Sequence, residues 1–326
     1  MTSLAPSPSL SSSSRLSSSS FHGRYGVVDV GSNAVRLHIE ASSFGLRQKL
    51  HSRRFRLRLG SEVFTAGEIS TETRRDLIEI FCEIRALLDS HAVTDSWAVA
   101  TSAMRDCRDS ARLVEEIREK CRVDLEIIDG KREAEIVFEA IRSLGLQARE
   151  LTLMDLGGGS LELVACRDAR FSHFASLQLG AVRALCAHEE GTGRLAAQIQ
   201  NQFDGVKNDL RRFSQTRNED RLLVGLGGNV RCLTNLAASV RVFPHHPRLL
   251  LKSELAALLK KLEPLRPRDR RHHWDLARDR ADVIVPAAKV ILEAMDRLGF
   301  DHLFAPKVSL KHGMIAALVN GKRTRA

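Results

Sequence analysis

Two short stretches hold the residues of this chain that are best suited to chemistry. The stretch "LTLMDLGGGSLELV" sets Asp155 before three glycines and a serine, and sets Glu162 just after them. The stretch "VVDVGSNAVRL" sets Asp29 before a Gly-Ser-Asn turn and Arg36 after it. Glycine permits a positive φ and lets a ligand approach the backbone N–H groups, which then form an anion-binding nest. Both turns are therefore predicted to bind phosphate.

A third glycine turn and the arginines near all three turns extend this pattern. The segment "VGLGGNVRCL" places its glycines where a helix opens, and a helix N-terminus attracts phosphate through its N–H groups and its dipole. Arginine forks match phosphate oxygens, although each arginine taken singly has the ordinary interpretation of a surface residue. The predicted phosphate-binding residues are Gly31, Ser32, Asn33, Arg36, Arg105, Gly157, Gly158, Gly159, Ser160, Gly227, Gly228 and Arg231.

Acids beside a phosphate nest need an explanation, because they repel phosphate. A divalent cation supplies one, since Mg²⁺ is usually held by one or two carboxylates together with substrate oxygens and waters. Asp29, Asp155 and Glu162 are the predicted metal ligands. The plain structural alternative is a pair of turn-stabilising aspartates and a surface glutamate on a strand.

A hydrolase also needs a base that orients and deprotonates water. The stretch "IIDGKREAEIVFEAI" holds Glu133 and Glu135 at a helix start, after a strand and a glycine turn. Alone, these are ordinary first-turn glutamates that the helix dipole favours. The residues themselves leave that choice open.

The elements that carry these motifs form a repeated pattern. A β-hairpin with a glycine or serine tip and an acid just before it occurs twice, surrounded each time by mixed strands and helices. This predicts two related α/β halves that face a cleft, with chance recurrence as the alternative. The first two glycine turns join strand to strand and no Gly-Lys-Ser/Thr follows, which excludes a Rossmann fingerprint and a Walker loop.

Composition narrows the class of partner. The chain has 326 residues and a formal net charge of +10, which favours a polyanionic partner, although many soluble proteins are simply basic. One Tyr and two Trp leave little with which to stack single-stranded nucleic acid. The basic stretch 267–280 has two open interpretations, a track for a long polyanion and a solvated connector.

Cysteines and the N-terminal segment bear on the compartment. The six cysteines contain no C-x-x-C pair, so we expect buried free thiols in a reducing cytoplasm and neither a disulfide framework nor a zinc site. Residues 1–20 are serine-rich and lack acids; a disordered tail is favoured over a transit peptide. No apolar run is long enough to span a bilayer.

Taken together, the motifs resemble the exopolyphosphatase / guanosine pentaphosphate phosphohydrolase (Ppx/GppA) family in its short form. The resemblance rests, in order along residues 25–315, on "VVDVGSNAVRL", "ATSAMRD", "IIDGKREAEIVFEAI", "LMDLGGGSLEL", "LGAVRAL", "VGLGGNVRCL" and "RADVIVPAA". It implies an actin-like, ribonuclease-H-like duplicated α/β fold with a central cleft. It also implies an N-terminal domain of residues 21–130 plus a returning helix 309–326, and a second domain of residues 131–308.

The resemblance implies roles as well. Glu133 matches the family's catalytic glutamate, Asp155 and Glu162 its metal-linked acids, and Arg105 its phosphate-binding arginine. The chain departs from the family pattern at Arg132, where a second glutamate is common. It departs again in "ATSAMRDCRDS", with its Cys and second Asp, and in "VSLKHGM", where an arginine and an acid are usual in place of Lys-His.

The implied activity is Mg²⁺-assisted release of the terminal phosphate from inorganic polyphosphate, or conversion of pppGpp to ppGpp. A polyphosphate or alarmone sensor without turnover and a kinase of the same fold remain alternatives, and nucleic acid is disfavoured as a partner. We further expect a cytoplasmic protein that does not bind membranes, and a homodimer is one possible assembly.

Overall fold

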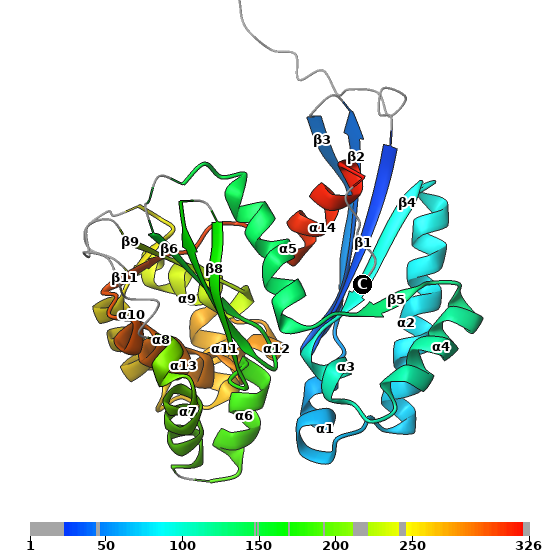
Figure 1. Ribbon diagram of the computed structural model, residues 1–326. Coiled ribbons are helices and arrows are strands. Elements are labelled where there is room, and N and C mark those ends of the chain that lie inside the picture. Colours follow the sequence, from blue (N-terminus) through cyan, green and yellow to red (C-terminus); the bar gives the residue numbers. More distant parts are fainter. Residues whose placement is uncertain are drawn as a thin grey trace, which may run out of the picture.

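The computed structural model describes residues 23–43, 46–146, 148, 150–168, 170–191, 193–210, 221–240 and 246–321. Two lobes lie side by side, and each is built on one mixed β-sheet with helices packed on it (Figure 1). The expected tail, residues 1–20, lies outside the described residues, as do the last five residues of the expected C-terminal helix. Within the described residues, no helix is long and apolar enough to cross a membrane.

The first lobe has a five-stranded sheet in the order β3-β2-β1-β4-β5. The hairpin strands pair antiparallel, and β4 and β5 add in parallel to β1. Its strands are β1 (Gly23–Gly31), β2 (Ala34–Ser43), β3 (Leu46–Phe55), β4 (Asp95–Ala100) and β5 (Leu125–Ile127). Its helices are α1 (Leu59–Ala66), α2 (Thr71–Ser90), α3 (Ser102–Asp106) and α4 (Ser110–Cys121).

The second lobe repeats this arrangement in the order β8-β7-β6-β9-β11, with β10 added at the edge. Again the hairpin strands are antiparallel and the next two strands are parallel, so the predicted duplication is confirmed. The strands are β6 (Glu150–Leu156), β7 (Leu161–Arg167), β8 (Arg170–Leu177), β9 (Arg221–Leu226), β10 (Leu249–Leu251) and β11 (His302–Phe304). The helices are α6 (Ala181–Glu189), α7 (Arg194–Gly205), α8 (Lys207–Leu210), α9 (Gly228–Ser239), α10 (Lys252–Leu262), α11 (Pro267–Trp274), α12 (Arg278–Ala281) and α13 (Ile284–Leu298).

The two central hairpins match residue by residue across the duplication. In β1–β2, Asp29 pairs opposite Arg36; in β6–β7, Asp155 pairs opposite Glu162. Directly opposed residues in an antiparallel pair lie within side-chain reach of each other. The first hairpin thus sets an aspartate beside an arginine, and the second sets an aspartate beside a glutamate.

Two helices connect the lobes through a shared apolar core. Helices α5 (Gly130–Arg142) and α14 (Leu310–Val319) lie between the two sheets (Figure 1). Their apolar faces pack with Trp97 of the first sheet and Leu153 of the second in one buried cluster. The other face of the first sheet is covered by α2 and α4. The division into residues 21–130 with 309–326 and residues 131–308 remains our proposal, supported by the two sheets and by the packing of α14 on β1.

One local expectation, that all six cysteines are free thiols, was wrong, and the basic stretch has a definite structure. The basic stretch 267–280 forms α11 and α12, and most of its side chains are exposed. Arg270 is the exception in α11: it is buried, and its guanidinium donates to the carbonyls of Leu262 and Ala281. The track for a polyanion and the solvated connector both stay open. Cys82 and Cys121 form a disulfide between α2 and α4, so free thiols remain only at Cys107, Cys166, Cys186 and Cys232.

The crossing of α5 and α14 depends on Gly313. A Cβ there would overlap the carbonyl oxygen of Ile136 in α5, which is backbone and cannot turn aside. We expect Gly313→Ala to lower the free energy of unfolding by about 1–3 kcal/mol, measured by denaturant titration.

Gly205 in α7 supplies the matched control, since a Cβ there meets no atom within 4 Å. Gly205→Ala should leave stability unchanged or raise it by up to about 1 kcal/mol. Equal stability of the two variants would show that the helices part at no cost and that the close crossing is unimportant.

Candidate active site

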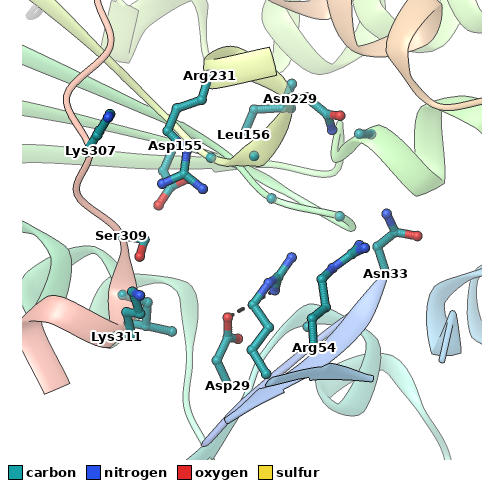
Figure 2. A pocket seen from close by; sticks show the side chains of 18 of the residues that line it. Asp29, Asn33, Arg54, Asp155, Leu156, Asn229, Arg231, Lys307, Ser309 and Lys311 are labelled. Atoms are coloured by element: carbon teal, nitrogen blue, oxygen red, sulfur yellow. Dashed lines mark hydrogen bonds and ion pairs between the residues drawn. The ribbon is translucent and has the colours of Figure 1, made fainter. Parts of the chain in front are cut away.

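A cavity of about 710 Å³ lies between the lobes, lined by both central hairpins, the third glycine turn and the starts of α5 and α14. Figure 2 shows acids and cations from both lobes converging on this space. The predicted site residues in its lining are Asp29, Gly31, Ser32, Asn33, Arg36, Glu133, Asp155, Gly157, Gly158, Gly227, Gly228 and Arg231. Arg105, Gly159, Ser160 and Glu162 are not in the lining and stand behind it.

The two hairpin tips contact each other directly. A Cβ on Gly158 would lie 2.7 Å from the Cβ of Ser32, and one on Gly159 would overlap the side chains of Ser102 and Phe64. Of the glycines predicted to bind phosphate, only Gly227 has a positive φ, at 96°. The expectation of positive φ in the GGGS loop is therefore wrong. Gly158 and Gly159 are required because the opposite lobe approaches them closely, and not because their backbone is left-handed.

The carbonyl oxygens of this loop hold the start of α6. Ala181 and Val182 donate their N–H groups to Gly157 and Gly158, and Arg183 Nε donates to the carbonyl of Gly159 at 2.9 Å. On the other lobe, the buried Ser32 Oγ has no hydrogen-bond partner within the part of the chain that the structure describes. A buried hydroxyl without a partner costs free energy, so an incoming phosphate oxygen would stabilise it.

Asn33 has a different use from the one predicted. Its Nδ2 donates to the carbonyl of Asp279 at 3.1 Å, and its Oδ1 accepts from Arg58 Nε at 2.7 Å. Arg58 also pairs with Asp282, and Arg54 pairs with Asp279. These contacts join the first lobe to α12 of the second, and they leave the Asn33 amide committed to the protein.

The acids repel one another in a buried setting. Burial and the charge of Asp29 raise the pKa of Asp155 to about 6, against the opposing effect of Arg231 and Arg36. Burial also raises the pKa of Glu162 to about 7, with Asp155 adding to the rise. Asp29 itself is paired with Arg36 at 3.1 Å.

Glu133 stands at the centre of this repulsion. Burial raises its pKa well above the ordinary value, and Glu162 and Asp155 raise it further. Arg105 opposes the shift: its guanidinium lies 3.4 Å from Glu133 Oε2 and donates to the carbonyl of Ile128 at 2.8 Å. Arg105 thus holds the carboxylate in place, whereas the sequence pointed to a direct phosphate contact.

Several cations of the lining were not predicted from the sequence. They come from β3, from the segment before β10, from α12 and from the approach to α14, far from the glycine motifs. They are Arg53, Arg54, Arg248, Arg280, Lys307 and Lys311. Two of them fall in stretches that the sequence singled out: Arg280 ends the basic stretch 267–280 and opens the motif "RADVIVPAA", and Lys311 lies in "VSLKHGM".

The acids are suited to a magnesium ion that they share with phosphate oxygens and water, and not to a site closed by protein ligands alone. Among the described residues, no group of three or more His, Cys, Asp or Glu side chains is placed to hold an ion. Mg²⁺ commonly takes one or two carboxylates and completes its shell with phosphate oxygens and water. Asp29 and Asp155 face the cavity and repel each other. They form a donor set for such an ion, whose positive charge would relieve the repulsion. Glu162 accepts from Ser176 at 3.4 Å, behind the lining.

Two duplicated lobes, touching glycine hairpins and buried acids in a cation-lined cleft define the actin-like class of phosphate-handling proteins. A sequence profile of the Ppx/GppA phosphatase family matches residues 38–321, and the chain belongs to this family. The family resemblance and fold class predicted from the motifs are thereby confirmed.

Individual relatives agree with this assignment. Exopolyphosphatase 1 of Mycobacterium tuberculosis is 28% identical over 299 residues, covering 90% of this chain and 87% of the relative. The guanosine-5'-triphosphate,3'-diphosphate pyrophosphatase of Vibrio atlanticus is 21% identical over 303 residues, covering 91% of this chain and 59% of that longer protein.

Solved structures share the fold. An exopolyphosphatase from Cytophaga hutchinsonii superposes with a TM-score of 0.80 at 24% identity, covering 91% of this chain and 98% of that one. The Ppx/GppA family member of Aquifex aeolicus gives 0.74 at 21% identity, covering 93% and 99%.

The raised pKa of Asp155 predicts that the metal-free protein loses stability as the pH rises. Asp155 has its pKa raised from an ordinary 3.8 to about 6, so the stability from its protonated form is present below pH 4 and lost as pH rises through 6. Asn cannot ionise. The melting temperature of Asp155→Asn minus that of the wild type, measured with a chelator present, should therefore grow from pH 4.5 to pH 7.5.

The exposed Glu119→Gln controls for loss of one negative charge. A difference for Asp155→Asn that stays constant with pH would contradict the electrostatic account. Mg²⁺ added at pH 7.5 should stabilise the wild type more than Asp155→Asn, since binding to the folded form alone raises its stability.

Proposed function

We propose that this protein is a phosphoanhydride hydrolase that releases the terminal phosphate of inorganic polyphosphate, with guanosine pentaphosphate as the second candidate substrate. The observation that carries the proposal is the position of Glu133. This half-buried carboxylate with a raised pKa lies in the lining of a cation-rich cleft, beside two touching glycine loops. A base whose pKa lies near the working pH is suited to accept a proton from water.

The chemistry follows from the residues in the lining. The backbone N–H groups of the two hairpin tips and the free hydroxyl of Ser32 would hold the terminal phosphate. Arg105 orients Glu133, which takes a proton from the attacking water. A magnesium ion held by Asp29 and Asp155 would, when bound, neutralise charge on the phosphate oxygens.

Polyphosphate is favoured over a guanosine nucleotide by the character of the lining. It includes six arginines and two lysines (Arg36, Arg53, Arg54, Arg231, Arg248, Arg280, Lys307 and Lys311), against three acids, Asp29, Glu133 and Asp155. No Phe, Tyr or Trp is among the described lining residues, so no aromatic ring is offered to a base. A flexible chain of phosphates matches such a surface more closely than a purine does.

A sensor without turnover and a kinase of the same fold are the other candidates. Tight polyphosphate binding without phosphate release would favour the sensor, and transfer from ATP to an acceptor would favour the kinase. A cytoplasmic location and homodimer formation remain predictions.

Glu133→Gln tests the function, because glutamine keeps the size of the side chain and removes the base. Phosphate release from polyphosphate should fall by about 100-fold or more, while binding is retained. Release should also depend on Mg²⁺, and pppGpp should be cleaved less efficiently than polyphosphate.

Glu135→Gln, two residues further along α5 and partly exposed, is the matched control and should keep its activity. Full turnover in Glu133→Gln would exclude this residue as the base. Binding without release by the wild type would replace the hydrolase with the sensor.

A further inference from the structure

One cation of the cavity has an unusual support. Lys311, the second residue of α14, lines the cavity, and its Nζ lies 3.5 Å from Nδ1 of His38, at the long end of a hydrogen bond. Among the described residues, no carboxylate is within ion-pair distance of this ammonium. A ring nitrogen therefore holds the ammonium in place without an ion pair, and the charge of Glu40 attracts it from beyond ion-pair distance.

The tautomer of His38 is set from its other side. His38 is buried on β2, and its Nε2 lies 2.7 Å from Glu40 Oε1. Burial acts to raise the pKa of Glu40, but the hydrogen bond from His38 and the charge of Arg47 outweigh it and lower that pKa. An ionised carboxylate only accepts, so Nε2 carries the proton and Nδ1 presents its lone pair to Lys311.

His312 does not share this role. Its Nδ1 accepts the N–H of Ser309 at 3.1 Å, which closes the N-terminus of α14 as a capping box. Burial and the charge of Lys311 lower the pKa of His312 to about 4, so its ring is neutral at pH 7. The unusual Lys-His pair thus divides into one residue that caps the helix and one that carries charge.

Other cations face the same space as Lys311. Arg231 and Arg36 lie close enough to act on its charge, and both repel it. Figure 2 shows Lys311, Ser309 and Lys307 along one side of the cavity and Arg54 and Asn33 along the opposite side, with Asp29 and Asp155 between. Like charges gathered around a cavity are stabilised by an anion that enters it.

We propose that Lys311, held by the His38–Glu40 pair, forms an anion subsite for a phosphate group of the substrate other than the one at the hairpin tips. This rests on the proposed function, and it makes Lys311 a binding residue and His38 a positioning residue. The two ends of a polyphosphate segment would then be held by separate contacts: the hairpin tips at one end and α14 at the other.

Lys311→Gln tests the subsite. KM for polyphosphate should rise by about tenfold or more, because a charge-assisted contact is lost, while kcat changes by less than about threefold. Lys311→Arg keeps the charge and should restore most of the affinity. Lys261→Gln is the control, because it removes the same charge from an exposed side chain of α10 that lies outside the lining.

His38→Phe tests the positioning role through non-additivity. If the ring acts by aiming the ammonium, His38→Phe should raise KM, and the double variant His38→Phe/Lys311→Gln should be no worse than Lys311→Gln alone. Additive effects would show that His38 acts only through packing, and would overturn its positioning role. A thermal melt of each variant checks folding, and if His38→Phe does not fold, Glu40→Gln replaces it.

Binding measurements separate this inference from the proposed function. Calorimetric titration of tripolyphosphate into Glu133→Gln and into Glu133→Gln/Lys311→Gln needs no turnover. Weaker binding in the second protein, by about tenfold, supports the subsite even if the wild type releases no phosphate. Equal binding in both, or a change no larger than that from Lys261→Gln, overturns it.

Discussion

The site depends on a close backbone contact between two hairpin tips that belong to different lobes. Gly158 meets Ser32 at a separation that excludes any side chain on the glycine. Because the tips touch, two glycine loops share one space, and the acids that precede them, Asp29 and Asp155, come within range of each other. Alanine at this contact would separate the lobes as well as fill the nest.

The electrostatics of the cleft follow from that contact. Repeating one hairpin across a duplication brings two aspartates together, and the cross-strand neighbour decides what each aspartate experiences. Arg36 neutralises Asp29, whereas Glu162 adds a second acid beside Asp155. The second lobe therefore carries the excess negative charge, and Glu133 lies against it. The ligand-free cleft is thus under mutual repulsion of like charges, and cationic and anionic ligands both relieve it.

The sequence predicted those features that local patterns encode. The hairpins, the acids before each tip and the catalytic candidate Glu133 all lie in contiguous motifs, and the duplication follows from their recurrence. The sequence did not indicate the reason for the glycines, since Ser32 meets Gly158 only after the lobes assemble. The disulfide joins Cys82 and Cys121, which are 39 positions apart in the sequence, and no local spacing encodes that pairing. Lys311 and His38 are 273 positions apart and meet only in the folded chain.

Besides the hairpin tips, two of the joints between the lobes have opposite character. Around α5 and α14 the joint is an apolar core, and around α12 it consists of Asn33 and Arg58 bonded to Asp279 and Asp282. Figure 1 shows these places on different parts of the interface between the lobes. Salt screens ion pairs that are partly open to water and leaves an apolar core intact. Ionic strength should therefore weaken the joint at α12 and leave the apolar joint at α5 and α14 intact.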